Sequence, residues 1–392
     1  IVNTCGFIDS AKQESIDSIL EMASCKESGN CKVLIASGCL AERYSDELLE
    51  EIPELDAVVG VGNYMEIDSV IKSILKDKIR IKKTNSTDYN IDFSSRRILT
   101  TPKYTAYLKI AEGCNNACTY CIIPKLRGVY RSRSIEKILD EAKKLSASGT
   151  REIILVAQDT SKYGIDLYGR KMLPELIEKL SQLEGIEWIR ILYCYPEDID
   201  DALIEAVKNN ENVCNYIDIP IQHVNNEILH NMGRLSNKES IECVIKKLRE
   251  NIPDIVIRTS IIVGFPGETE QQFNELYNFI KEYRLDRGGV FTYSREENTE
   301  AYSFEGQIDE KTKKIRYKKL MSLQKKISKE KNKEKCGNIY KVLVEGKNDR
   351  GYIIGRTYGD APDIDGIVYI KPYDKDAESS KYKDSIKEGS FI

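Results

Sequence analysis

The stretch AEGCNNACTYCIIPKLRG, residues 111–128, places three cysteines within eight positions. Their spacing is C-x3-C-x2-C, and the residues are Cys114, Cys118 and Cys121. A structural zinc site usually takes four ligands in two separated pairs, but the next cysteine is Cys194 and the first histidine is His223. Three thiolates instead suit a [4Fe–4S] cluster that leaves one iron open. The stretch therefore predicts an iron–sulfur site, with zinc or an accidental grouping as the alternatives.

These cysteines follow the first of six predicted strands, which alternate with helical patterns. The expected strands span 104–110, 151–157, 187–193, 215–221, 255–263 and 288–293. The helical pattern at 134–149 is expected to end at Gly149. Six such units predict a parallel sheet with right-handed crossovers, either open or curled into a partial (βα)6 barrel. The three cysteines then lie at the carboxyl end of the sheet, where active sites of α/β proteins are found.

Polar residues and glycines follow the later strands at the same predicted edge. Each alone is as well explained by a turn or by a satisfied polar core group, but together they favour a cofactor-binding face. The residues are Gln158 and Asp159 after the second strand, Tyr193 and Tyr195 after the third, Gln222 and His223 after the fourth, and Gly264, Gly267 and Glu268 in GFPGETE after the fifth.

Two further cysteines, Cys5 and Cys39, each come directly after a predicted strand of an N-terminal α/β segment. The carboxyl ends of parallel strands meet at one edge, so the two residues should lie near each other. Burial as small hydrophobic residues is an equally good explanation from the residues alone. Cys25 and Cys31 fit no pattern.

Four segments are predicted along the chain. Residues 1–95 form the N-terminal α/β domain, with a helix at 11–23, strands at 32–38 and 56–62, and a polar linker at 82–97. Residues 100–308 form the central α/β domain, and 309–335 form a basic helix with 12 Lys and Arg against 4 Asp and Glu. That helix is either a solvated connector or a docking surface for an acidic partner such as RNA. Its expected apolar stripe consists of Ile315, Leu320, Leu323 and Ile327, and residues 336–392 predict a small β-barrel.

The composition narrows the setting of the protein. Of 392 residues, 41% are hydrophobic and 31% charged, which is ordinary for a globular protein. The net charge of −4 excludes a uniformly basic surface. No apolar run of about 18 residues and no signal peptide is visible, and eleven scattered cysteines do not form a disulfide framework. We therefore expect a cytoplasmic protein without a membrane segment. The chain begins IVNTCGF without Met, so we expect upstream residues to be missing.

The C-x3-C-x2-C run, with Tyr120 before its last cysteine, resembles the radical S-adenosylmethionine (SAM) enzymes. The resemblance implies that Cys114, Cys118 and Cys121 hold a [4Fe–4S] cluster whose open iron binds SAM. One electron then cleaves SAM, and the resulting deoxyadenosyl radical abstracts a hydrogen atom. GFPGE resembles the SAM motif that follows the fifth strand. We expect cofactor contacts from Gln158, Asp159, Gln222, Gly264 and Glu268.

The stretches NTCGFIDSAKQES and SGCLAERY resemble the N-terminal domain of the methylthiotransferase branch of this superfamily. In that branch three cysteines hold an auxiliary [4Fe–4S] cluster, and Cys5 and Cys39 match two of them. The third is expected upstream of residue 1, and replacement by Cys25 or Cys31 is a weaker alternative. The implied reaction uses two SAM molecules, one as methyl source and one as radical source.

The stretch NTCGFIDSAKQESI and three others resemble the branch member that methylthiolates an aspartate β-carbon in protein twelve of the small ribosomal subunit. The three others are KLRGVYRSRSI, LVAQDTSKYGIDLYG and RTYGDAPDIDG, and Tyr130 stands where the tRNA enzymes usually carry Glu. The basic residues Lys125, Arg127, Arg131 and Arg133 are expected to steer an acidic substrate loop, and packing beside the cluster is the alternative. A tRNA adenosine methylthiotransferase is the nearest alternative, and a non-catalytic iron–sulfur carrier is a more distant one.

The C-terminal barrel resembles a TRAM domain. It carries 9 basic and 10 acidic residues, with Asp360, Asp363 and Asp365 close together, which favours a basic protein partner over RNA. The resemblance also implies an electron donor such as flavodoxin or ferredoxin and a sulfur donor. We expect a monomer.

Overall fold

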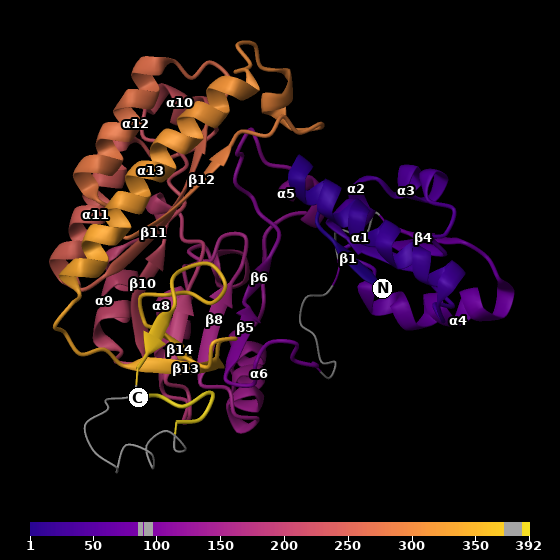
Figure 1. Cartoon of the computed structure of the whole chain (residues 1–392), viewed down its shortest axis with the longest axis horizontal. Coiled ribbons are helices and arrows are strands. Elements are labelled where there is room, and N and C mark those ends of the chain that lie inside the picture. Colours follow the sequence, from indigo (N-terminus) through magenta and orange to yellow (C-terminus); the bar gives the residue numbers. More distant parts are fainter. Residues whose placement is uncertain (85–88, 90–96, 372–385) are drawn as a thin grey trace.

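The computed structural model describes residues 1–84, 89, 97–371 and 386–392. Its largest element is a parallel sheet of six strands in the order β12-β11-β10-β9-β8-β5 (Figure 1). The strands are β5 (Thr105–Lys109), β8 (Glu152–Val156), β9 (Trp188–Ile191), β10 (Val213–Asp218), β11 (Val256–Val263) and β12 (Arg287–Thr292). All six predicted strands are confirmed within a few residues. Strands β5 and β12 stand at the two edges of the order and do not pair with each other, so the sheet is not closed, in agreement with the predicted partial barrel.

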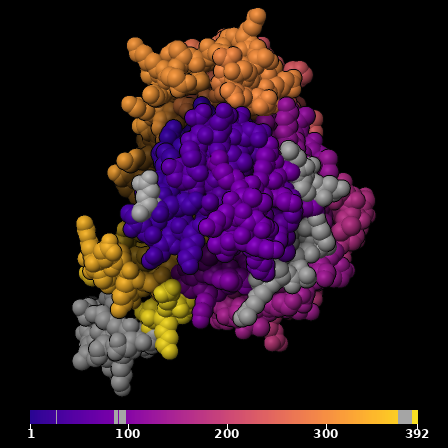
Figure 2. Space-filling model, turned by 90° about the vertical axis from the view of Figure 1, so that its right-hand side faces the viewer, coloured from indigo at the N-terminus to yellow at the C-terminus, as the bar shows by residue number. Residues whose placement is uncertain are grey.

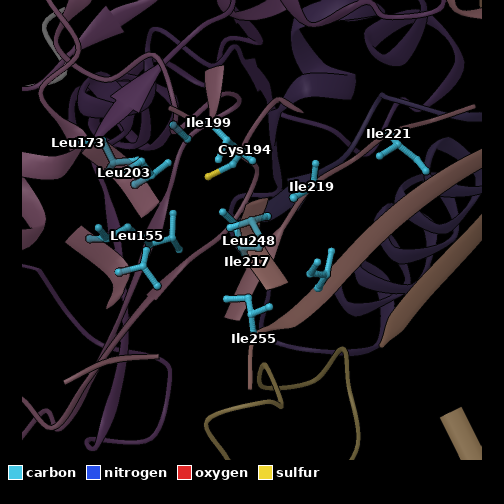
Figure 3. Packing of buried hydrophobic residues seen from close by; sticks show 14 of the residues in the cluster. Leu155, Leu173, Cys194, Ile199, Leu203, Ile217, Ile219, Ile221, Leu248 and Ile255 are labelled. Atoms are coloured by element: carbon cyan, nitrogen blue, oxygen red, sulfur yellow. The ribbon is translucent and has the colours of Figure 1, made fainter. Parts of the chain in front are cut away.

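Amphipathic helices cover the outside of this sheet. They are α6 (Ile135–Ala147), α8 (Leu173–Ser181), α9 (Asp201–Asn209), α10 (Asn226–Asn231), α11 (Lys238–Asn251) and α12 (Glu270–Tyr283). The short helix α7 (Ile165–Tyr168) has no buried residue and is not part of this layer. In α8 the residues at i, i+3, i+4 and i+7, Leu173 to Leu180, are at most 1% exposed because this stripe packs against the sheet. Figure 3 shows part of that core, including Cys194, whose side chain is fully buried among apolar neighbours.

Short elements connect these layers. The cysteine loop lies between the short strand β6 (Ala111–Glu112) and helix α5 (Ile123–Arg127), and β6 pairs with β7 (Arg131–Ser132). Three 3-10 turns, Tyr64–Glu66, Pro196–Asp198 and Glu300–Ser303, complete the connections. Helix α6 ends at Ala147, and Gly149 follows with φ +103°, a backbone conformation that glycine adopts without strain.

The N-terminal segment forms a second parallel sheet in the order β1-β2-β3-β4. Its strands are β1 (Val2–Thr4), β2 (Ile35–Gly38), β3 (Ala57–Val59) and β4 (Ile81–Lys83), and its helices are α1 (Asp9–Ser28), α2 (Cys39–Arg43), α3 (Ser45–Glu51) and α4 (Ile67–Asp77). The predicted helix and strands are confirmed, but the linker prediction missed β4. Most of that predicted linker lies outside the described residues.

Helix α13 (Glu310–Glu334) crosses the partial barrel and leads to the C-terminal segment (Figure 1). Leu320, Leu323 and Ile327 are buried as predicted, but Ile315 is 56% exposed. Ile315 lies five residues before Leu320, about 140° around the helix, and therefore falls off the apolar stripe. Lys313 and Arg316 are buried in its place, so the helix is not a fully solvated connector.

The C-terminal segment is an antiparallel sheet of β13 (Val342–Lys347), β14 (Ile353–Thr357) and β15 (Val368–Ile370). It docks on the barrel through buried ion pairs: Glu152 of β8, fully buried, accepts hydrogen bonds from Arg190 of β9 and Arg356 of β14. Asp360 pairs with Arg287 at 2.5 Å, and Asp365 accepts a hydrogen bond from the Tyr216 hydroxyl at 2.7 Å. The prediction that these two aspartates form an acidic partner surface is therefore wrong, because their carboxylates bind the barrel.

Candidate cluster and cofactor site

The loop that carries Cys114, Cys118 and Cys121 is closed on itself by backbone hydrogen bonds. The Cys114 amide donates to the Gly128 carbonyl at 3.2 Å, and the Cys121 amide donates to the Cys118 carbonyl at 3.0 Å. Gly113 has φ +80°, and a Cβ there would lie 2.2 Å from the Val129 carbonyl oxygen. Only glycine fits this position, so the loop holds one tight conformation.

The three thiols of this loop differ in exposure. Cys114 and Cys118 are buried and Cys121 is partly exposed. Burial raises the pKa of Cys114, and it raises the pKa of Cys121 to about 12. In the part of the chain that is described, no three His, Cys, Asp or Glu side chains converge as they would around a single metal ion. Three cysteines on one loop are the number of thiolates that a [4Fe–4S] cluster with one open iron takes.

Asp159, predicted as a cofactor contact, faces the cysteine loop. Its carboxylate is fully buried and accepts hydrogen bonds from the Asn116 side chain at 2.8 Å and the Ser161 hydroxyl at 2.5 Å. Burial raises the pKa of Asp159, and these two hydrogen bonds oppose that rise. The carboxylate therefore anchors the loop between Cys114 and Cys118. The neighbouring Gln158 has a buried side-chain oxygen without a hydrogen-bond partner among the described residues.

Glu268, a second predicted cofactor contact, is likewise turned toward protein groups. Its carboxylate accepts a hydrogen bond from the Gly264 amide and lies 3.2 Å from Nη1 of Arg316 on α13. Gly264 has φ +75°, and a Cβ there would lie 2.4 Å from Cγ of Lys313. Helix α13 thus packs directly on the GFPGE loop, and Glu268 ties the two together.

The residues after the fourth strand lie beside this loop. Gln222 has φ +67°, an uncommon backbone conformation for a residue with a side chain, and its amide and carbonyl bind Ser260 and Ile262 of β11. His223 is fully buried, and its Nδ1 accepts a hydrogen bond from the Asn225 amide at 3.0 Å. The proton therefore sits on Nε2, which points to Glu268 Oε1 at 3.7 Å. The structure thus brings the residues of the fourth and fifth strand ends together.

Arg234 is a residue that the sequence analysis missed. Its buried guanidinium stacks on the Tyr195 ring at 4.1 Å, and the Tyr195 hydroxyl lies 3.8 Å from the Cys118 sulfur. The loop around Arg234 is held against the cysteine loop because the Thr119 amide donates to the Met232 carbonyl at 3.0 Å. Tyr193, predicted beside Tyr195, is 42% exposed. No local signal in NMGRLS points to Arg234, since the contact arises only when two distant loops pack.

Cys5 and Cys39 are brought together by strand pairing. Thr4 of β1 pairs with Gly38 of β2, and each cysteine is the next residue along its strand. At Gly6 a Cβ would lie 2.8 Å from the Leu40 backbone, so the two segments pass in close contact. Cys39 is buried and Cys5 is exposed. Two thiols at one sheet edge fit part of a cluster's ligand set.

Cys25 and Cys31 are remote from this pair. Cys25 lies near the end of α1, about 24 Å along the helix from Asp9, and Cys31 precedes the amino end of β2. Cys39 lies at the carboxyl end of that strand. The alternative in which Cys25 or Cys31 replaces a cluster ligand is therefore wrong for this structure.

Helix α5 joins the two cysteine regions (Figure 1). Leu126 of this helix and Ile122 just before it pack against the N-terminal domain. They form one small apolar cluster with Phe7, Cys39 and Val61. At the edge of this cluster Arg127 donates one hydrogen bond to Glu112 at 2.8 Å and another to the Cys39 sulfur at 3.3 Å.

The basic residues predicted to steer a substrate are bound internally. Arg133 is buried and pairs with Glu141 at 2.7 Å, and Arg127 is held by Glu112 and Cys39. Lys125 donates to the Asn298 carbonyl at 2.8 Å. The steering prediction is therefore wrong for Arg127, which joins the two domains through Cys39, and for Arg133, which pairs within the central domain.

A second contact between the domains centres on Glu296, after β12. Its buried carboxylate accepts hydrogen bonds from Lys12 at 2.9 Å and Arg43 at 2.8 Å, both from the N-terminal domain. Figure 2 shows this domain facing the viewer, with the orange segment after β12 directly above it. Among the described residues no helix is long and apolar enough to span a bilayer.

Comparisons with known protein families match all three parts of the chain. Residues 108–280 match the Radical SAM superfamily, residues 1–60 match the Uncharacterized protein family UPF0004, and residues 336–391 match the TRAM domain. The cysteine loop lies inside the first match, and Cys5 and Cys39 lie inside the second.

Relatives resemble the chain over nearly its whole length. A Clostridium perfringens protein named ribosomal protein uS12 methylthiotransferase RimO is 56% identical over 372 residues, which are 95% of this chain and 83% of that protein. The proteins of the same name from Clostridium botulinum and Clostridioides difficile are 54% and 52% identical, over 99% and 95% of this chain and 86% and 84% of theirs.

Among solved structures, the radical S-adenosylmethionine methyltransferase TsrM from Kitasatospora setae is similar with a TM-score of 0.55 and 14% sequence identity. The similarity covers 69% of this chain and 57% of TsrM. It supports the α/β fold of the central domain.

Proposed function

The chain belongs to the family of ribosomal protein uS12 methylthiotransferases, which are radical SAM enzymes, and on this premise we propose that it methylthiolates the β-carbon of an aspartate in uS12. The observation that carries the proposal is the 52–56% identity to uS12 enzymes over at least 95% of the chain. That similarity includes both cysteine regions and the TRAM domain. It favours uS12 over the tRNA adenosine alternative.

We propose that Cys114, Cys118 and Cys121 hold the radical-generating cluster. A [4Fe–4S] cluster with one open iron supplies, when bound, the electron that cleaves SAM. The protein's part is to keep the loop rigid: Asp159 holds Asn116, and Gly128 holds Cys114. Buried side chains around the thiols exclude water, which protects reactive species from side reactions.

The remaining rim residues are proposed to place SAM. Gly264 and Gln222 lie near the strand ends with φ of +75° and +67°, and Gln158 offers a buried oxygen that has no partner among the described residues. Asp159 and Glu268 are proposed to position the loops around SAM without touching it, because their carboxylates already bind Asn116 and Arg316. They orient the two loops between which the cofactor must fit.

We propose that Cys5 and Cys39 are two ligands of an auxiliary [4Fe–4S] cluster. Support comes from their adjacent places at the end of β1 and β2 and from the match of residues 1–60 to the N-terminal family. The implied partners are uS12, an electron donor such as flavodoxin or ferredoxin, and a sulfur donor. The free state of all eleven cysteines fits a reducing compartment, which we propose to be the cytoplasm.

The direct test uses the complete natural protein, reconstituted under anaerobic conditions with iron and sulfide. With recombinant uS12, SAM and reductant, we expect mass spectrometry to find one methylthio group on an aspartate. The Cys118→Ala, Cys121→Ala double variant is the matched control and should leave uS12 unmodified. Transfer to tRNA but not to uS12, or loss of a tRNA modification alone in a deletion strain, would contradict the proposal.

Iron analysis tests the two clusters separately. We expect about eight irons per chain in the wild-type protein and about four in the Cys5→Ala, Cys39→Ala double variant, because each cluster holds four irons. The same iron content in both proteins would leave Cys5 and Cys39 as ordinary structural residues.

A further inference from the structure

Arg127 is placed between the two cysteine regions. It is the last residue of α5, six positions after Cys121, and its side chain is 25% exposed. One nitrogen of its guanidinium donates to Glu112 Oε1 at 2.8 Å, and the other donates to the Cys39 sulfur at 3.3 Å. The side chain therefore spans from the central domain to a thiol of the N-terminal domain.

We propose, resting on the auxiliary cluster proposed above, that Arg127 is a positioning residue of that site: held by Glu112, it donates a hydrogen bond to the Cys39 sulfur and raises the reduction potential of the cluster bound there.

Glu112 provides a rigid support for this hydrogen bond. It is fully buried on β6, whose pairing with β7 fixes the backbone. Lys109 occupies Oε2 at 2.6 Å, which leaves Oε1 for Arg127. The Arg127 carbonyl is also fixed, because it accepts a hydrogen bond from Arg131 at 3.1 Å. Both ends of the residue are therefore held, and the second guanidinium nitrogen points toward Cys39.

The adjoining residue makes a matching contact with the other cysteine region. The Gly128 carbonyl accepts the hydrogen bond from the Cys114 amide at 3.2 Å. Residues 127 and 128 therefore bind a cysteine of each region, one through a side chain and one through the backbone. Among the described cysteines of the two regions, the guanidinium of Arg127 contacts Cys39, so an electrostatic effect should fall mainly on the N-terminal site.

The direction of the effect follows from charge. Reduction of a cluster adds one negative charge, and hydrogen bonds to the cluster sulfurs and the local net charge set its potential. A guanidinium remains protonated at every physiological pH, so its positive charge favours the reduced state. A charge-assisted hydrogen bond in a partly buried contact is stronger than the same contact in water.

The test is a redox titration followed by electron paramagnetic resonance. The Cys118→Ala, Cys121→Ala background removes the other cluster, so the signal comes from the N-terminal site only. In the complete natural protein we compare Arg127, Arg127→Gln, Arg127→Lys and Lys125→Gln. Lys125→Gln is the matched control, because it removes one positive charge from the same helix but its amine binds Asn298 and not Cys39.

We expect Arg127→Gln to lower the midpoint potential by about 59 mV or more, equivalent to a tenfold change in the ratio of reduced to oxidised cluster. The midpoint potential of Arg127→Lys should lie between those of the wild-type protein and Arg127→Gln, because a lysine keeps the charge but loses the forked geometry. Lys125→Gln should leave the potential unchanged. A residue that only joined the domains would not shift the potential of an intact cluster.

Two results would overturn the inference: an unchanged potential in Arg127→Gln with full iron content, or an equal shift in Lys125→Gln. If Arg127→Gln loses iron, the midpoint potential is measured in Arg127→Lys instead. An unchanged potential in that variant, or an equal shift in Lys125→Gln, would then overturn the inference. If the wild-type protein binds only about four irons, the proposal of an auxiliary cluster is contradicted. Iron analysis shows this before any Arg127 variant is measured.

Discussion

The two cysteine regions reach their arrangements by different routes. Cys114, Cys118 and Cys121 belong to one loop of eight residues, closed by its own backbone hydrogen bonds. Cys5 and Cys39 are 34 positions apart and meet only because β1 and β2 pair in parallel. The first region is a local motif, and the second is a product of topology. We therefore expect substitutions in the loop to remove one function outright, and substitutions around the pair to act on the second region and its contact with the first.

The largest effect is expected from Cys118→Ala. Loss of one of three thiolates should leave the loop without a cluster, so SAM cleavage and methylthiolation should both fall to background. Deoxyadenosine formation and iron content measure this, and about four irons should remain if the N-terminal site is independent. Substantial deoxyadenosine production by Cys118→Ala would contradict the assignment of the loop.

Cys39→Ala should separate the two regions. We expect SAM cleavage to persist, because the loop is intact, and methylthio transfer to uS12 to be lost. Deoxyadenosine and modified uS12 are measured in the same reaction. The matched control is Cys243→Ala, since Cys243 is exposed on α11 and should support both activities at wild-type level. Unchanged methylthio transfer to uS12 by Cys39→Ala would contradict a separate role for the N-terminal cysteine pair.

Glu296→Ala should loosen the contact between the regions. Removing the buried carboxylate leaves Arg43 without its ion-pair partner, which costs about 3–5 kcal/mol, while Lys12 keeps its ion pair with Asp9. We expect earlier urea unfolding of the N-terminal domain and weaker transfer with SAM cleavage retained. Glu297→Ala is the control, because that side chain is exposed and its loss should change stability by about 0.5 kcal/mol or less.

The smallest effect is a pH dependence that arises at Glu112. Burial alone would raise the pKa of this carboxyl, but Lys109 and Arg127 lower it to about 2. The unfolded value is about 4.3, so ionised Glu112 contributes about 3 kcal/mol to stability above pH 4.3. This contribution is lost as the pH falls from about 4.3 to about 2.

The measurement is the difference in free energy of unfolding between the wild-type protein and Glu112→Gln. We expect the pH-dependent part of that difference to fall at pH 3 to less than half of its value at pH 7. A difference that stays constant over this range would show that Glu112 is not held ionised by its two cations.

Local patterns allowed much of the fold to be predicted. The six strands of the central sheet appear within a few residues of their predicted positions because each is a short apolar run bounded by turn residues. The short strand β4 was missed, since Ile81–Lys83 has one partly buried residue and two exposed lysines. The assignment of Ile315 to the apolar stripe failed because one misplaced position shifts a residue to the other side of a helix.

Charged residues were predicted least well. Arg127, Arg133, Asp360 and Asp365 were expected to face a substrate or partner, and the structure pairs all four internally. From the sequence alone a charged residue is expected to be exposed, because burying a charge without a partner is costly. Its partner is usually far away along the chain, as with Arg356 and Glu152. The boundaries of the domains stay a prediction.

The sequence by itself determined the C-x3-C-x2-C loop and the alternation of strands and helices, because each of these depends on residues close together in the chain. Only the tertiary structure decided that Arg127 reaches Cys39, that Glu296 joins the domains, and that Asp159 and Glu268 hold loops instead of lying open at the rim. These contacts join residues up to 284 positions apart, as with Lys12 and Glu296, and their geometry follows from packing, which no local pattern encodes.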